Sequence, residues 1–176
     1  MSLVTKSNIP SKEWGLPGPG YAINFFVGCS GRCTYCWARD MAVRFGQVNV
    51  GDWGRPRVKR GYRCDFPAIQ LYCEFENLPP GNVLISATCD FYDPAIPDSA
   101  LFTGSLLGSL PFKTLHTFWV LTKRAEVVRD MSWMRHQDIH VGLSITDTIA
   151  RPEEPGSSPN PERIEALRQL HEAGVK

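Results

Sequence analysis

Residues 28–37 read GCSGRCTYCW and place three cysteines, Cys29, Cys33 and Cys36, in a C-x3-C-x2-C pattern. Thiolates spaced in this way on one loop can converge on a soft metal centre, for which zinc, copper(I) and iron-sulfur clusters are the candidates. A closed zinc site takes four protein ligands, and residues 37–56 contain no further cysteine or histidine. A cubane cluster can use three cysteines and leave one iron open to a small molecule. The pattern therefore favours a reactive metal centre.

The cysteine run resembles the signature of the radical S-adenosylmethionine (radical SAM) superfamily. Asn24 and residues 28–30 and 35–39 are similar to the N-x-x-x-G-C-S and Y-C-Y-A-R runs of the spore photoproduct lyase-like group, with Trp37 in place of the usual tyrosine. Later segments are similar to further motifs of that group, namely TCDFYDP at 88–94, LTK at 121–123, LSIT at 143–146 and the helix at 159–174. The resemblance spans residues 21–176 and is strongest at the cysteines.

The resemblance implies that Cys29, Cys33 and Cys36 hold a [4Fe-4S] cluster whose fourth iron is chelated by S-adenosyl-L-methionine (SAM). With an electron from an external one-electron reductant, the cluster would cleave SAM to a 5'-deoxyadenosyl radical that abstracts hydrogen from a substrate. The sequence does not identify that substrate, and nucleic acid is one candidate. The chain would then be a radical SAM enzyme. Two alternatives stay open: a non-catalytic iron-sulfur or zinc-binding protein, and an inactive truncated radical SAM fragment.

The resemblance also implies roles for polar side chains at predicted strand ends. Ser86, Thr88 and Asp90 end the second strand, where the group binds the amino group of SAM, and an acceptor there suits an ammonium. Ser144 and Thr146 would hydrogen-bond the ribose or the carboxylate of SAM. A simple turn after the second strand and ordinary strand-end hydroxyls are the alternatives.

Tyr35 and the remaining cysteines have competing interpretations. Tyr35 would pack against the adenine of SAM or only shield the cluster from solvent. Cys89 is a candidate catalytic hydrogen donor, because spore photoproduct lyase uses a cysteine near this strand end. Alignment on Asp90, however, puts Cys89 where a serine is expected, and a buried inert thiol is the alternative. Cys64 and Cys73 are expected to be structural, unless further ligands join them in a second cluster.

Four apolar runs predict buried strands, at residues 22–27, 83–88, 117–122 and 139–145. Helices are expected at 37–45, 101–110 and 124–135. A last helix should have Asn160 as its N-cap, Pro161 in its first turn, Gly174 as its C-terminal cap, and an inner face of Ile164, Leu167, Leu170 and His171. Strands that alternate with helices in this way predict an α/β fold with a parallel sheet and right-handed crossovers.

The ligand site of such a sheet lies at the carboxyl ends of its strands, where the cysteines, Asp90, Lys123 and Thr146 would meet. The resemblance implies a partial (β/α) barrel of the radical SAM type, with about four β/α units, truncated before the fifth strand. Residues 1–20 would form an irregular N-terminal lead-in, and residues 21–176 the radical SAM core with an insertion at about 46–80.

The composition, with 43% hydrophobic and 21% charged residues, is that of a soluble enzyme. No apolar run approaches the length of a membrane span, and the first residues, MSLVTK, lack the apolar stretch of a secretory signal. Clustered cysteines in a chain of this size also argue against a disulfide scaffold. We therefore expect a cytoplasmic protein without a membrane partner.

A basic segment stands out against the formal net charge of +1. It contains five cations, interleaved with Trp53 and Tyr62: Arg55, Arg57, Lys59, Arg60 and Arg63. Such a segment can hold phosphates and stack a base, which makes nucleic acid a candidate partner. A solvated loop broken by glycine and proline is the alternative interpretation.

Overall fold

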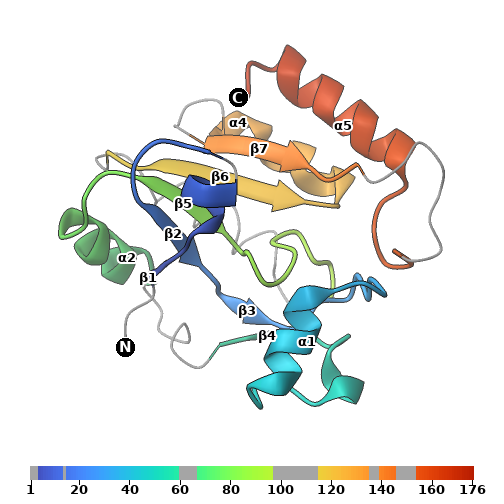
Figure 1. Ribbon diagram of the computed structural model, residues 1–176. Helices are drawn as coiled ribbons and strands as arrows, with labels where there is room; N and C mark the ends of the chain where they lie inside the picture. Colours follow the sequence, from blue (N-terminus) through green and yellow to red (C-terminus); the bar gives the residue numbers. More distant parts are fainter. Residues whose placement is uncertain (1–3, 14, 60–66, 97–114, 135–138, 146–153) are drawn as a thin grey trace.

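A computed structural model describes residues 4–13, 15–59, 67–96, 115–134, 139–145 and 154–176 (Figure 1). Its main feature is a five-stranded sheet in the order β1-β2-β5-β6-β7. Strands β2, β5, β6 and β7 run parallel to one another, and β1 pairs antiparallel with β2. The strands span Val4–Lys6 (β1), Gly20–Ile23 (β2), Asn82–Ile85 (β5), Thr117–Thr122 (β6) and Ile139–Leu143 (β7).

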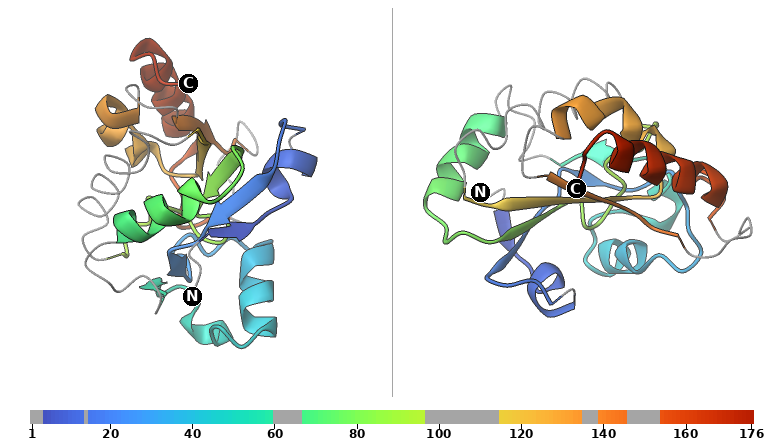
Figure 2. Two further views of the ribbon diagram at one scale, coloured as in Figure 1. Left: turned by 90° about the vertical axis from the view of Figure 1, so that its left-hand side faces the viewer. Right: turned by 90° about the horizontal axis from the view of Figure 1, so that it is seen from above.

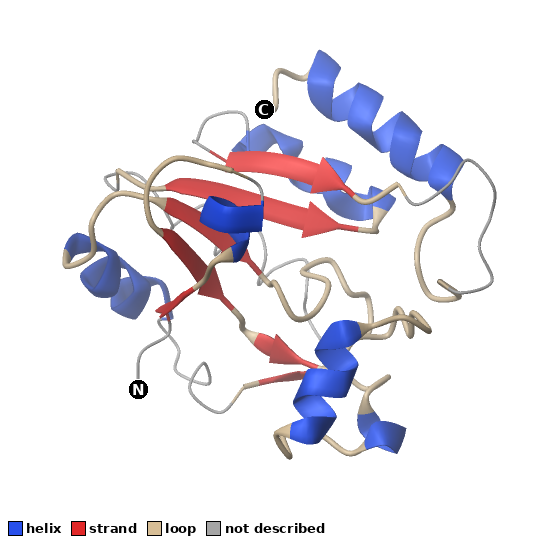
Figure 3. Cartoon of the chain, in the orientation of Figure 1, coloured by secondary structure: helices blue, strands red, loops and turns tan. Residues whose placement is uncertain are grey.

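The sheet agrees with the predicted mixed α/β fold, in which sequential strands lie side by side. The expected irregular lead-in is wrong in part, because β1 extends the sheet and a five-residue π-helix, η1 (Ile9–Glu13), follows it. The described strands form an open sheet (Figure 3), and the partial barrel stays a prediction. No helix in the described part of the chain is both long and apolar enough to cross a membrane.

The predicted strand at 22–27 is divided in two. It leaves the main sheet after Ile23, and Phe26–Val27 forms β3, which pairs antiparallel with β4 (Arg57–Val58) in a separate small sheet. The side chain of Asn24 stabilises the break, since its Oδ1 accepts hydrogen bonds from the backbone N and the Oγ1 of Thr88, at 3.0 and 3.1 Å. Apolar character alone does not reveal such a break.

Helices α2 (Pro67–Glu76), α4 (Met131–Met134) and α5 (Asn160–Glu172) lie on the same side of the sheet (Figure 2). Helix α1 (Trp37–Arg44) agrees with the predicted helix after the cysteines. The predicted helix at 124–135 is instead a 3-10 segment, η4 (Ala125–Asp130), followed by α4. The predicted helix at 101–110 lies outside the described residues.

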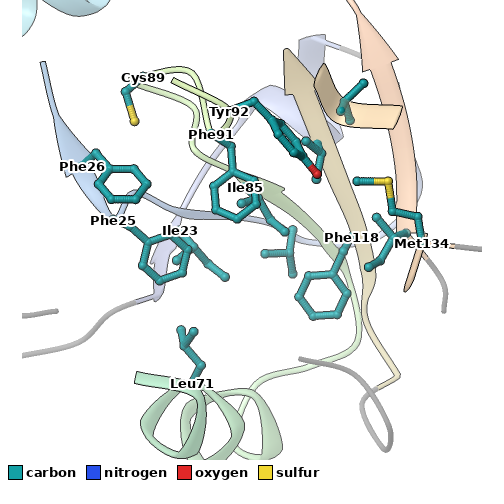
Figure 4. Packing of buried hydrophobic residues seen from close by; sticks show 14 of the residues in the cluster. Ile23, Phe25, Phe26, Leu71, Ile85, Cys89, Phe91, Tyr92, Phe118 and Met134 are labelled. Carbon is teal, nitrogen blue, oxygen red and sulfur yellow. The ribbon is translucent and has the colours of Figure 1, made fainter. Parts of the chain in front are cut away.

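The segment at 46–80, expected to be an insertion, contains the short 3-10 turn η2 (Val50–Asp52), strand β4 and helix α2. Helix α2 is part of the core, because Leu71 and Phe75 are buried there with side chains of the main sheet. Figure 4 shows Leu71 facing Ile23 and Phe25 across this core. The ring of Phe75 meets that of Phe118 edge-on, with centroids 5.5 Å apart.

Helix α5 differs in detail from the prediction. Its N-cap is Pro159, and Asn160 is the first helical residue. The buried face consists of Asn160, Arg163, Ala166 and Leu170, whereas Ile164 is 49% exposed. The C-terminal cap agrees with expectation: Gly174 has φ +79°, and the backbone N atoms of Gly174 and Val175 donate to the carbonyls of His171 and Leu170, which is a Schellman motif.

Candidate functional site

The carboxyl ends of β3, β5, β6 and β7 border one cavity of about 380 Å³. Its lining includes almost every residue predicted for the site: Cys29, Cys33, Tyr35, Cys36, Ser86, Thr88, Cys89, Asp90, Lys123 and Ser144. The remaining predicted residue, Thr146, lies outside the described part of the chain. The strand ends therefore bring together side chains that are more than a hundred residues apart in the sequence.

The cysteine loop begins where β3 ends. Gly28 has φ +92°, and a Cβ at this position would lie 2.8 Å from the carbonyl oxygen of Trp53, so the turn requires glycine. The backbone N of Cys29 donates to that same oxygen at 2.9 Å. The first cysteine is thereby tied to the chain that follows η2.

All three cysteines of the loop are free and partly exposed. The Sγ atoms of Cys29 and Cys33 lie 3.3 and 3.8 Å from the point that a Cβ on Gly31 would occupy, so glycine leaves room between two thiols. Burial raises the pKa of Cys29 to about 12 and also raises the pKa of Cys33. Both thiols are therefore protonated in the metal-free chain, and a metal would displace the protons.

The donor set fits a soft metal centre in its chemistry. Three free cysteines line the cavity, and thiolates are ligands both of zinc and of iron-sulfur clusters. Among the described side chains, no three of His, Cys, Asp or Glu are gathered so that they would hold a metal ion as they stand.

Asp93 and Arg124 fix the loop from the side of β5 and β6. The Asp93 carboxylate is fully buried and accepts from the backbone N of Ser30 at 2.5 Å, from Ser30 Oγ at 2.6 Å and from the backbone N of Ala95 at 2.9 Å. Arg124 Nη2 donates to Ser30 Oγ at 3.0 Å. Because Ser30 follows Cys29, these two buried side chains set the position of the first cysteine.

Asp90 joins the loop after β5 to the end of β6. Its Oδ1 accepts from Thr122 Oγ1 at 2.7 Å and from the backbone N of Tyr92 at 3.0 Å, and its Oδ2 accepts from the backbone N of Lys123 at 2.9 Å. Burial raises the pKa of Asp90, and these hydrogen bonds oppose the rise. The carboxylate lines the cavity, although the protein itself already uses both oxygens.

A buried ionic network centred on Glu154 also contacts the loop, at Tyr35. Glu154 Oε2 accepts from Arg163 Nη2 at 2.8 Å, and both side chains are 3% exposed. Glu154 Oε1 accepts from Lys123 Nζ and from the hydroxyl of Tyr35. Lys123 Nζ also lies 4.8 Å from the centroid of the Tyr35 ring. Tyr35 is thus held by its hydroxyl, while its side chain remains half exposed.

Residues 154–158 lie directly against the cysteine loop. The backbone N of Gly156 donates to Gly31 O at 3.2 Å, and a Cβ on Gly156 would lie 2.3 Å from Ser30 O. Arg163 of α5 anchors this segment, since it donates to the carbonyls of Ser158 and Ser144 at 2.6 and 2.7 Å. One arginine of α5 therefore connects the end of β7 to the chain that covers the cysteines.

The remaining predicted residues have different surroundings. Ser86 has φ +57°, and its buried Oγ has no hydrogen-bond partner among the described residues. Thr88 is engaged with Asn24, and the backbone N of Ser144 donates to Thr122 O at 2.9 Å. Cys89 is buried, and burial raises the pKa of its thiol well above the ordinary value.

Four residues that hold the site were not predicted from the sequence, namely Asp93, Arg124, Glu154 and Arg163. Asp93 lies within the quoted 88–94 segment, and Arg163 is an arginine at the same helical spacing as the buried Ala166 and Leu170. A cation on a buried helix face signals a buried partner, because an unpaired buried charge is costly. Glu154 has no comparable signal, since it stands in a polar loop.

The basic segment is only partly described. Arg55 and Arg57 are exposed, and Arg57 Nη2 donates to Gln47 O at 2.8 Å, while Lys59 is half-buried. Arg60, Tyr62, Arg63 and Cys64 lie outside the described residues, and Cys73 is exposed on α2. The idea that Trp53 stacks a base on the surface is wrong, because this residue is only 3% exposed and packs in an apolar cluster.

No family model matches the chain. The chain is similar to Uncharacterized protein MJ0683 of Methanocaldococcus jannaschii, with 31% identity over 97% of this chain and 62% of that protein. It is also similar to Uncharacterized protein ORF301 of Acidianus two-tailed virus, with 27% identity over 89% of this chain and 53% of that protein. The chain therefore spans a little over half the length of these relatives.

Solved structures of spore photoproduct lyase share the fold. The lyase complexed with dinucleoside spore photoproduct superimposes with a TM-score of 0.67 at 21% identity. A lyase mutant with bound AdoMet and dinucleoside spore photoproduct gives 0.66 at 22% identity. Both matches cover 89% of this chain and 43% of the lyase chain. The likeness shows a mixed α/β fold with a mainly parallel sheet, similar to that of a radical SAM lyase.

Proposed function

We propose that the chain is a radical SAM protein, in which Cys29, Cys33 and Cys36 hold a [4Fe-4S] cluster and the adjoining cavity holds SAM. One observation carries the proposal: the three thiols and the polar strand ends share one cavity, in a fold similar to that of spore photoproduct lyase. When bound, this pair supplies one-electron cleavage of a C–S bond and the hydrogen abstraction that follows.

The side chains of the chain would bind and orient these groups. The Ser86 hydroxyl is buried on the cavity wall without a partner in the described part of the chain, so a ligand would satisfy it. Asp90 and Ser144 offer further polar atoms at the neighbouring strand ends. Residues 154–158, which lie on Ser30 and Gly31, would help to exclude water from the cysteines.

Nucleic acid is the proposed substrate class. The support comes from one structural neighbour, the lyase complexed with dinucleoside spore photoproduct, together with the exposed Arg55 and Arg57 of this chain. The proposed chemistry also needs an external reductant and a reducing compartment, which agrees with the expected cytoplasmic location. Cys89 would be the candidate hydrogen donor, because its thiol lines the cavity and burial keeps it protonated, as a donor of a hydrogen atom must be.

Anaerobic reconstitution with iron and sulfide tests the proposal. We expect close to four irons per chain, an electron paramagnetic resonance signal after reduction with dithionite, and release of 5'-deoxyadenosine from SAM. Cys33→Ser should abolish both the signal and the product, whereas Cys73→Ser, at an exposed cysteine on α2, should leave them unchanged. A cluster that never cleaves SAM would favour a non-catalytic iron-sulfur protein. One tightly bound zinc per chain would favour a zinc-binding protein.

A second pair of variants tests the gap at Gly31. Gly31→Ala places a methyl group 3.3 Å from Cys29 Sγ, so we expect weaker iron loading. Gly51→Ala is the matched control, because nothing lies within 4 Å of a Cβ at Gly51. Equal iron content in the two variants would argue against a cluster in this gap.

A further inference from the structure

A second cavity of about 260 Å³ lies between α1 and the small β3–β4 sheet. Figure 1 shows α1 beside these two strands, away from the main sheet. Its lining includes Trp37 and Met41 of α1 and Phe45, the C-cap of that helix, which follow one another at four-residue spacing. These apolar side chains are 55%, 40% and 64% exposed, so one ridge of the helix offers them to solvent.

The lining of this cavity also includes a lysine that forms no ion pair with the described residues. Lys59 is half-buried, and no carboxylate in the described part of the chain forms an ion pair with its ammonium. Its backbone N donates to Phe25 O at 2.8 Å, which holds the residue next to Asn24. Burial lowers the pKa of Lys59, as expected for a cation that loses water and gains no anion.

Asn24 and Trp53 add neutral donors to this cavity, and Gln47 adds a side-chain amide that can donate or accept. Asn24 Oδ1 is occupied by the two hydrogen bonds from Thr88, which leaves the Nδ2 group of Asn24 to donate. The indole N–H of Trp53 is buried without a hydrogen-bond partner among the described residues. No Asp or Glu of the described residues lines the cavity. A half-buried cation with neutral donors beside it and no carboxylate in the lining favours a ligand that carries negative charge.

We propose that this second cavity binds an anionic group, a phosphate or a carboxylate, attached to a planar apolar body. The anion pairs with Lys59 and accepts from Asn24 and Trp53, while the planar part packs on the α1 ridge. Trp37, Ala38, Trp53 and Thr88 line both cavities, so the two spaces adjoin. If the proposed function holds, a ligand that fills both would place its far end beside the cysteines.

Titration of the metal-free chain with phenyl phosphate, followed by tryptophan fluorescence and calorimetry, tests the site without any cluster. We expect phenyl phosphate to bind more tightly than inorganic phosphate and more tightly than phenol. A comparison of benzoate with phenyl phosphate then shows whether the site prefers a carboxylate or a phosphate. Lys59→Met should weaken phenyl phosphate at least about tenfold, since a charge-assisted hydrogen bond is lost. Lys59→Arg should retain binding.

Two further variants separate the charge from the apolar wall. Phe45→Ala should bring the affinity for phenyl phosphate close to that for inorganic phosphate, and Phe45 is exposed enough for the fold to tolerate the change. Lys6→Met, at an exposed lysine of β1, should leave every affinity unchanged. Equal binding of phenol and phenyl phosphate, or equal losses in Lys59→Met and Lys6→Met, would overturn the proposal. Cluster loading plays no part in these outcomes, so a failure here is distinct from a failure of the proposed function.

Discussion

The two sides of the cysteine loop are held by different forces. On the side of β5, β6 and α5, buried charged groups bind the loop through directional contacts: Asp93 and Arg124 at Ser30, and Glu154 with Lys123 at Tyr35. On the side of α1 and β3, the loop rests on an apolar cluster of Val27, Ala38, Ala42, Val48 and Trp53. Cys29 and Cys36 contact this cluster as partly buried residues.

The difference indicates how the loop is positioned. Apolar contacts stabilise in proportion to the area buried and have little directional preference. A buried charge, by contrast, requires its partners at fixed positions, because removal of one partner leaves another without compensation. We therefore expect changes on the charged side to displace the thiols most. Changes on the apolar side should lower stability mainly where they disturb the close backbone contacts of the loop.

The largest expected effect is that of Arg163→Met. The change leaves Glu154 with Lys123 as its remaining cation and removes the donors to the carbonyls of Ser158 and Ser144. Breaking a buried pair in this way should lower the free energy of unfolding by about 4 kcal/mol. Urea denaturation followed by circular dichroism measures the loss. A change no larger than that of an average surface substitution would refute a charged clamp on the cysteine loop, by which we mean Asp93, Lys123, Arg124, Glu154 and Arg163.

Asp93→Ala should have the next largest effect. It leaves the backbone N–H groups of Ser30 and Ala95 without their acceptor, at a site that is fully buried. A loss of about 3 kcal/mol is expected. Iron content after reconstitution should also fall, because Cys29 adjoins Ser30. Asp40→Ala, at a side chain that is 71% exposed, is the control and should alter neither quantity. Normal iron loading in Asp93→Ala would show that the apolar side alone positions the cysteine.

Much of the main sheet could be predicted from the sequence. The strand at 117–122 agrees with β6 at both ends, because an uninterrupted apolar run between polar turns has one reasonable interpretation. The strand at 22–27 could not be predicted correctly, since its break depends on the Asn24–Thr88 hydrogen bonds between distant residues. Helix α2 was missed because its apolar face becomes evident only against the sheet that it covers.

The candidate site, like the sheet, could be predicted only in part. The cysteines and the strand-end residues are adjacent in sequence to recognisable strands, so a parallel sheet predicts that they meet. The clamp residues come from separate loops and from α5, and tertiary contacts alone bring them together. The inner face predicted for α5 is confirmed in part, because Leu170 is buried and Leu167 packs against the core. It is wrong at Ile164, which is apolar and exposed, and it missed Arg163, which is charged and buried. Charged residues are usually exposed, but the ion pair with Glu154 allows Arg163 to be buried.

A smaller effect is expected on the apolar side from Gly28→Ala. The backbone at Gly28 has φ +92°, and the added Cβ would lie 2.8 Å from Trp53 O. Strain and steric contact together should lower stability by about 2 kcal/mol. Gly46→Ala is the matched control, since its φ is +64° but nothing lies within 4 Å of the Cβ; its loss should be about 1 kcal/mol. Equal losses would mean that the contact with Trp53 relaxes freely.

The smallest effect is expected from Arg168→Met, which isolates burial as the cause of the difference. Arg168 stands on the same helix as Arg163 and also pairs with glutamates, with Arg168 Nη2 and Glu165 Oε1 2.6 Å apart. Its side chain is 57% exposed, however, and water and salt can replace the glutamates. The urea midpoint of Arg168→Met should match that of the wild type, at low and at high salt. A loss comparable to that of Arg163→Met would mean that ion pairing on α5, rather than burial beside the cysteine loop, stabilises the clamp.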